Sequence, residues 1–361
     1  MKRISFPVLV MSILWIMGGL VFAGSSQELL DLAQSIELAK EQSIQLQLSR
    51  LDLEEARLQF EQAKAMSLVQ PSPSKLYQAE ANLGITEKNL ILAEQNLALE
   101  VEQDYYNYLR TQNLITVLEE ALELAKRQLE VTESRRRVGA ATEADVIRAQ
   151  ASVARTEADL AQVRDSHELS RRKFLQSLGL PVDTSIQLDE GIVAERVSID
   201  LDRAIAEALA NRVEVAQLDM MIGVAEKEVE LATNDYTPGQ QLAMAKIALE
   251  KARLRRQQLE DNLPLEIRHL YAQLQDAERR LDVTRIGVLE AEETMRTTTA
   301  LYDVDMATHL DLMGAQANLT KARTDAIHAI FDYNLAKANL YKAMAWGLAE
   351  REVGNEKEHQ D

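Results

Sequence analysis

The stretch RRRVGAATEADVIRAQ, residues 135–150, decides the fold of this chain. A charged helical pattern runs into it and meets Gly139, and a new helical pattern leaves it. Glycine readily adopts the left-handed backbone conformation that ends many helices. Thr142 then follows as a capping residue, and Glu143 and Asp145 place negative charge in the first turn of the next helix. We therefore predict a tight turn between two antiparallel helices.

The same turn recurs 166 residues further along the chain. The aligned pairs are Val138 and Val304, Gly139 and Asp305, Thr142 and Thr308, and Asp145 and Asp311. Aspartate tolerates the left-handed conformation less well than glycine but better than most residues. Residues 30–66 align in the same way with residues 199–235. We infer two copies of one unit, each with a short helix, a long helix, a tight turn and a return helix.

Composition and spacing indicate coiled coils built from small side chains. The chain is 46% hydrophobic but only 4% aromatic, so aliphatic residues must fill most of the core. Apolar residues alternate at intervals of three and four, as a coiled-coil seam requires. In the return helices these stripes comprise Ala144, Ile147, Ala151, Ala154, Ala158 and Ala161, and Leu310, Met313, Ala317, Thr320, Thr324 and Ile327. We interpret the stripes as hairpin seams.

The long helices are expected to differ at one residue. The first is predicted to run from about Ser74 to Arg137, which is roughly 95 Å at 1.5 Å per residue. Pro264 lies inside the second and removes a backbone donor. We therefore expect a kink or a short break there.

The first residues resemble an export signal. Lys2 and Arg3 precede an apolar run from about Val8 to Phe22, and small residues allow cleavage after Ala23. The run is shorter than the ~20 residues that span a bilayer, so we favour a cleaved signal over a membrane anchor. The predicted division is a signal peptide (1–23), a first helical repeat (24–180), a linker (181–198), a second helical repeat (199–348) and a disordered tail (349–361).

Charge and residue types argue against several functions. The net charge is -18, which gives no support for nucleic-acid binding because that requires basic surfaces. The chain has no cysteine, and it shows neither a Gly-rich phosphate loop nor a catalytic constellation. We therefore expect no enzymatic activity, no cofactor and no metal site.

Several segments, taken in order, resemble the TolC-like outer-membrane efflux protein family. LDLAQSIELAKEQSIQLQLSRLDLEEARLQFEQAKAM (30–66) is similar to the opening helix of that family, and RRRVGAATEADVIRAQASVARTEADL (135–160) to its first hairpin tip. LPLEIRHLYAQLQDAERRL (263–281) and LYDVDMATHLDLMGAQANLTKAR (301–323) are similar to its second-half helices. The resemblance covers nearly the whole mature chain.

The resemblance implies an exported homotrimer of the periplasm and outer membrane. Its all-α hairpins would form a hollow tube, joined through a periplasmic adaptor protein to an inner-membrane transporter for efflux or type I secretion. By position, the adaptor contacts would be Val138, Gly139, Thr142, Asp145, Val304, Asp305, Thr308 and Asp311. Candidates for the channel constriction are Tyr302, Asp303 and Asp305.

One departure from the family concerns the far end of the tube. The family inserts two transmembrane β-strands between the opening and long helices of each repeat. Here the joints SLVQPSPSKLY (67–77) and NDYTPGQQLA (234–243) are too short, because one such strand takes ~9–11 residues. We therefore expect these strands to be missing. That leaves a second hypothesis, a structural or adaptor-type coiled-coil protein of the envelope that transports nothing.

Overall fold

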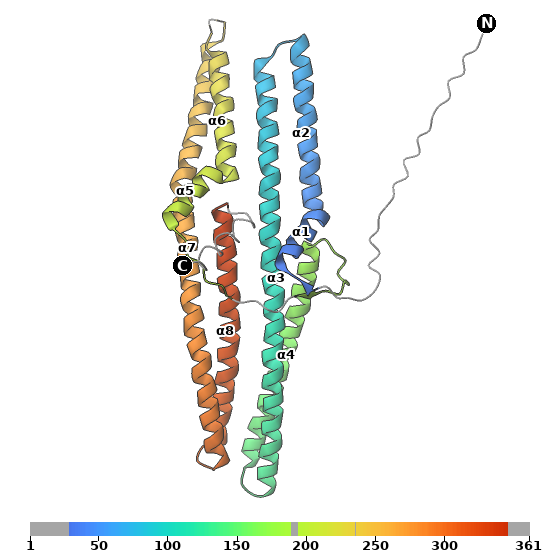
Figure 1. Ribbon diagram of the computed structural model, residues 1–361, viewed down its shortest axis with the longest axis vertical. Helices are drawn as coiled ribbons and strands as arrows, with labels where there is room; N and C mark the ends of the chain where they lie inside the picture. The colour runs from blue at the N-terminus through green and yellow to red at the C-terminus, as the bar shows by residue number, and fades with distance from the viewer. Residues whose placement is uncertain (1–28, 189–193, 235, 346–361) are drawn as a thin grey trace, which may run out of the picture.

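The computed structural model describes residues 29–188, 194–234 and 236–345, so the predicted signal peptide and tail lie outside the described ranges. Over these residues the chain forms eight helices and two strands of two residues each (Figure 1). The elements of the first repeat are β1 (Leu29–Leu30), α1 (Leu32–Gln42), α2 (Ile44–Val69), α3 (Pro73–Arg137) and α4 (Glu143–Ser177). After β2 (Gln187–Leu188), the second repeat comprises α5 (Leu201–Asn211), α6 (Val213–Ala232), α7 (Gly239–Asp303) and α8 (His309–Ala343).

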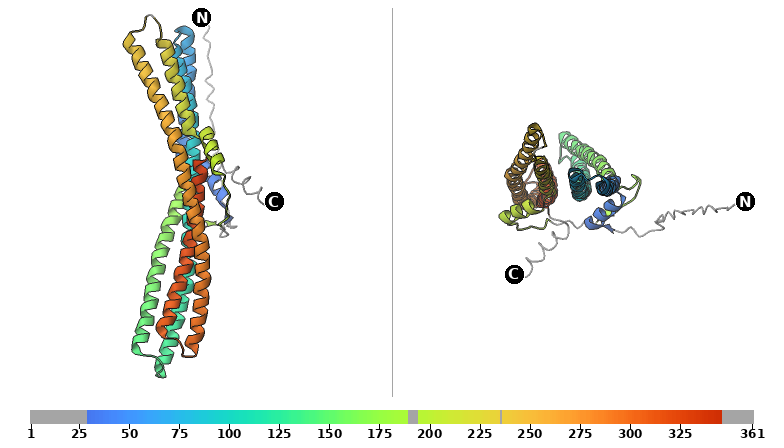
Figure 2. Two further views of the ribbon diagram at one scale, coloured as in Figure 1. Left: turned by 90° about the vertical axis from the view of Figure 1, so that its left-hand side faces the viewer. Right: turned by 90° about the horizontal axis from the view of Figure 1, so that it is seen from above.

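The helices form an elongated, curved wall (Figures 1 and 2). The two 65-residue helices α3 and α7 run its whole length, roughly 97 Å each. At one end the contacts run in the order α2, α3, α6, α7, and at the other in the order α4, α3, α8, α7. The α2–α3 and α6–α7 joints lie together at what we call the distal end, and the α3–α4 and α7–α8 turns at the tip end. The predicted all-α fold of two tandem hairpin repeats is confirmed.

The best-buried core lies midway along the wall, where the short helices add a second layer. Against α1, the first repeat buries Tyr105, Tyr106, Leu109 and Phe174. A corresponding cluster in the second repeat surrounds α5, α7 and the end of α8. The parallel pairing of β1 with β2 lies beside the first cluster and joins the linker to the start of the chain.

The return helices contact their hairpin partners through a different face from the predicted one. In α4 the buried residues include Val146, Ala149 and Leu160, whereas the predicted stripe from Ala144 to Ala161 is exposed. The predicted seam is therefore wrong for the hairpin. The helix carries two stripes of equal spacing, and spacing alone does not determine which stripe meets the partner.

Two further expectations concern the interruptions of the long helices. α7 continues through Pro264 as one helix, so the predicted short break is absent. Its neighbours Leu263 and Ile267 are fully buried in the second core, and this packing holds the helix together across the missing hydrogen bond. In the described parts of both joints, residues 70–72 and 233–238 without 235, the chain forms no strand. None of the described helices is apolar enough over a sufficient length to cross a bilayer.

Candidate functional site at the hairpin tips

The first tip turn is built as its sequence predicts. α3 ends at Arg137, and Gly139 adopts φ +80°. The Ala140 amide donates to the Arg135 carbonyl at 2.8 Å, which closes the end of the helix. The prediction that glycine permits this turn is confirmed, and the left-handed backbone explains the choice of residue.

Thr142 then begins α4 through a reciprocal cap. Its hydroxyl oxygen accepts from the Asp145 amide at 3.2 Å, and the Asp145 carboxylate accepts from the Thr142 amide at 3.0 Å and from the Thr142 hydroxyl at 2.6 Å. These hydrogen bonds lower the pKa of the Asp145 carboxyl, because they stabilise its charged form. The tip is therefore a rigid, charged corner rather than a loose loop.

The second tip repeats this geometry with one change of residue. Asp305 stands at the glycine position with φ +59°, and the Met306 amide donates to the Leu301 carbonyl at 2.8 Å. Thr308 and Asp311 form the same capping box, with distances of 3.2, 2.9 and 2.6 Å. The structure thus brings the predicted residues of each copy into matching turns at one end of the wall.

Arg135 joins the two tips. Its guanidinium donates to the Asp305 carboxylate at 2.8 Å and to the Tyr302 carbonyl at 3.2 Å, and it lies 4.2 Å from the centre of the Tyr302 ring. The Tyr302 side chain is buried in this contact, whereas Asp303 and Asp305 are exposed. The repeat could not have indicated Arg135, because its counterpart in the second copy is Leu301.

A buried histidine packs behind this contact. His309 Nδ1 lies 3.3 Å from the Gln128 amide nitrogen and 3.5 Å from the Thr132 hydroxyl, both on α3. Its Nε2 is buried and has no hydrogen-bond partner among the described residues. Burial lowers the pKa of His309, although the Asp145 carboxylate partly opposes this. The tip junction therefore favours neutral histidine.

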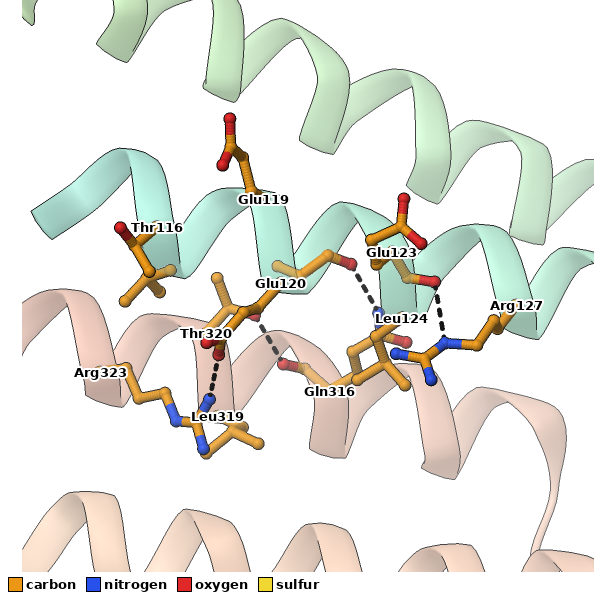
Figure 3. A pocket seen from close by; sticks show the side chains of 12 residues that line it. Thr116, Glu119, Glu120, Glu123, Leu124, Arg127, Gln316, Leu319, Thr320 and Arg323 are labelled. Carbon is orange, nitrogen blue, oxygen red and sulfur yellow. Dashed lines mark hydrogen bonds and ion pairs between the residues drawn. The ribbon is translucent and has the colours of Figure 1, made fainter. Parts of the chain in front are cut away.

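A groove follows the junction between the repeats above the tips. It is about 610 Å³ and lies between α3 and α8 (Figure 3). Arg323 on α8 spans it, contacting Glu120 on α3 and Glu292 on α7 at 2.9 Å each. The Gln316 amide donates to the Ala121 carbonyl at 3.4 Å. These contacts fasten the two repeats together, and the groove walls mix small apolar and charged side chains.

No group of three or more potential metal-ligating side chains gathers within the described ranges. His309 in particular faces an amide, a hydroxyl and an aromatic ring. What the tips present to solvent is instead apolar and acidic, including Val138 (80% exposed) and Val304 (63% exposed).

Comparison with known proteins agrees with this geometry. Residues 72–180 match the family model described as outer membrane efflux protein, and this segment contains α3, the first tip and α4. No curated protein sequence matches the chain.

Solved structures with the same fold are bacterial outer-membrane proteins. VceC from Vibrio cholerae matches with a TM-score of 0.72 and 18% identity, over 88% of this chain and 96% of that one. The CmeC outer-membrane channel of Campylobacter jejuni gives 0.71 and 15% over 91% and 88%. The MtrE outer-membrane channel of Neisseria gonorrhoeae, in its open state, gives 0.73 and 15% over 88% and 90%.

The fold therefore places this chain in the class of helical-wall proteins to which these structures belong. The family match within residues 72–180 makes the assignment more specific. The predicted resemblance to TolC-like outer-membrane efflux proteins is confirmed.

Proposed function

We propose that this chain is the protomer of an outer-membrane-efflux-type conduit. Three copies would form a helical tube in the cell envelope, working with a periplasmic adaptor and an inner-membrane transporter in efflux or type I secretion. The family match and the shared fold of outer-membrane channels support this proposal. Its own structural support is an uncovered edge on each side of the wall.

The repeat predicts what covers these edges. Inside the protomer, α8 of the second repeat packs on α3 of the first. The offset of 166 residues relates α4 to α8 and α7 to α3. α4 of one copy should therefore pack on α7 of the next in the same manner. Such a head-to-tail contact uses two different surfaces and generates a closed ring when the rotation closes.

The exposed stripe of α4 is the clearest part of this surface. Ala151, Ala154 and Ala158 are exposed, whereas their counterparts in α8 lie beside α3. A row of alanines lets a neighbouring helix approach closely. The stripe that the sequence assigned to the hairpin is thus better explained as a contact between copies.

Gly287 on α7 is the matching feature of the opposite edge. It is the counterpart of Ala121, which contacts α8 through its carbonyl. A Cβ atom at Gly287 would meet nothing within 4 Å in the protomer. A glycine inside a helix costs about 1 kcal/mol relative to alanine. Close approach of a second copy gives that cost a physical reason.

The distal half carries longer apolar side chains on the same two edges. On α2 they follow the coiled-coil spacing at Ile44, Leu48, Leu51, Leu58 and Val69, and on α7 at Met244, Ile247, Leu254 and Leu265. All are at least half exposed in the protomer. Burial of such rows on association would stabilise the ring by the hydrophobic effect.

The tips are the proposed adaptor contact. The matching turns place Val138, Gly139, Thr142 and Asp145 beside Val304, Asp305, Thr308 and Asp311 at one end of the wall. Asp303 and Asp305 remain candidates for the constriction because both are exposed. Tyr302 would contribute through its contact with Arg135, since its ring is buried within the protomer.

The oligomeric state tests the proposal. We expect the purified protein to be a trimer by light scattering, with and without detergent, and Gly287→Leu to be a folded monomer. Gly314→Leu is the matched control, because Gly314 is also helical with nothing within 4 Å, but it lies on α8, an inner helix of the wall. A wild-type monomer, or a Gly287→Leu trimer, would contradict the proposed ring.

Adaptor binding needs a separate test in cells. The chain has no cysteine, so Val138→Cys provides a unique site for a photo-crosslinker. We expect capture of an adaptor encoded with an inner-membrane transporter, and no such capture from Gln70→Cys at the distal end.

The absence of strands in the described joints keeps a second candidate, a non-transporting spacer of the envelope. A trimer whose deletion leaves substrate accumulation in cells unchanged would favour the spacer.

A further inference from the structure

The distal end of the wall differs in chemistry from the rest of the molecule. The whole chain is 27% charged with a net charge of -18. Around the first joint, residues 62–79 contain only two charged side chains, Lys64 and Lys75. Around the second, residues 231–249 contain only Asp235 and Lys246. A strongly acidic protein therefore ends in a nearly uncharged, weakly basic surface.

The same end exposes large apolar side chains. Leu68 and Val69 in the last turn of α2 are 85% and 89% exposed, and Tyr236 in the second joint is 97% exposed. The Tyr236 amide donates to the Asn234 side chain at 2.9 Å, which fixes the backbone beside the ring. Pro71 and Pro238 prevent α2 from continuing and α7 from beginning earlier. The apolar side chains are thus presented at the ends of rigid helices.

We propose that this distal end docks on the surface of a lipid bilayer with anionic headgroups. Leu68 and Tyr236 would enter the interfacial layer, where aliphatic side chains are buried and tyrosine combines an apolar ring with a polar hydroxyl. Lys75 and Lys246 are exposed and would face the headgroups, whereas Lys64 lies 3.8 Å from Glu61.

Charge favours a lipid surface over a protein partner. Anionic headgroups attract nearby lysines and would repel the acidic surface that covers most of this chain. Each joint alone offers only a weak contact. The inference rests on the proposed trimer in one respect: three copies would present six joints at one end, and their contacts would act together.

The occupied surface is distinct from the proposed contact between copies. Leu68 and Tyr236 lie outside the stripes that α2 and α7 present at the edges, whereas Val69 belongs to one of them. Changing Leu68 and Tyr236 therefore tests docking without altering the ring. Val138 and Val304 at the tip end provide a matched pair of exposed apolar residues.

The experiment is vesicle flotation of the purified protein, with light scattering of each sample. Wild type should float with phosphatidylglycerol–phosphatidylethanolamine vesicles and much less with phosphatidylcholine vesicles. The double variant Leu68→Ser with Tyr236→Ser should lose at least about tenfold in binding, because it removes the apolar side chains that enter the lipid. Val138→Ser with Val304→Ser should float as wild type.

Several results would overturn the docking proposal. A wild-type trimer that does not float, a distal variant that floats normally, or a tip variant that loses binding equally would each do so. Pairing of trimers that only the distal variant abolishes would show that a second copy, rather than lipid, occupies this end. A protein that is not a trimer would instead contradict the proposed function, and light scattering reveals that separately.

Discussion

The aspartate in the second tip turn allows backbone strain to be separated from an ion pair. Asp305 has φ +59° and also accepts a hydrogen bond from Arg135 at 2.8 Å. Replacement by alanine or by glycine removes the same carboxylate. The two variants then differ chiefly in backbone freedom, because only glycine adopts this conformation without strain.

The expected magnitudes follow from exposure. The Asp305 side chain is 81% exposed, so its ion pair should contribute about 0.2–1 kcal/mol. A left-handed conformation costs an L-residue other than glycine roughly 1–2 kcal/mol. Asp305→Ala should therefore weaken the tip by up to about 1 kcal/mol. Asp305→Gly should be neutral or slightly stabilising, since relief of strain offsets the lost pair.

Local hydrogen exchange measures this difference at the right place. The Met306 amide, bonded to the Leu301 carbonyl, reports opening of the second turn, and the Ala140 amide in the first turn is the internal control. A gap of about 1.4 kcal/mol between the two variants corresponds to roughly tenfold in exchange rate. Equal exchange in Asp305→Ala and Asp305→Gly would refute the strain argument and leave the ion pair as the dominant effect.

Two further predictions concern pH and the same turns. Thr142→Ala should cost about 1 kcal/mol of local stability and raise the pKa of Asp145 toward its usual value, because the carboxylate loses a hydroxyl donor. Nuclear magnetic resonance titration checks this, with Asp311 as the internal control; an unchanged Asp145 titration would contradict it. Burial lowers the pKa of His309 in the folded chain, so tip stability should be full above the usual value of about 6.5 and should fall as the pH drops below it. Exchange at the start of α8 should show this loss, and His309→Gln should abolish it; an unchanged pH dependence in His309→Gln would contradict the assignment.

Local chemistry made the hairpins and the repeat predictable. Glycine, threonine and aspartate at set positions define the first turn, and the second turn follows from the offset of 166 residues even though aspartate replaces glycine. The extent of α3 was predicted to within one residue because charged and apolar side chains alternate regularly up to the turn. Such features depend on neighbours within a few residues along the chain.

Long-range contacts were not predictable in the same way. Arg135 contacts Asp305 across 170 residues, and no repeat relates the two. His309 is buried only because α8 packs on α3 at that level. Spacing likewise could not show which stripe of α4 meets α3, since both stripes have the period of a coiled coil.

The sequence by itself determined that the chain forms two helical hairpins with capped turns, because backbone conformation and capping act locally. Only the tertiary structure decided which faces these helices bury and which they leave uncovered. Burial depends on the packing of helices that are far apart in the chain. That packing leaves the alanine stripe of α4 and the apolar distal joints exposed, and the proposed contacts with other copies and with lipid rest on them.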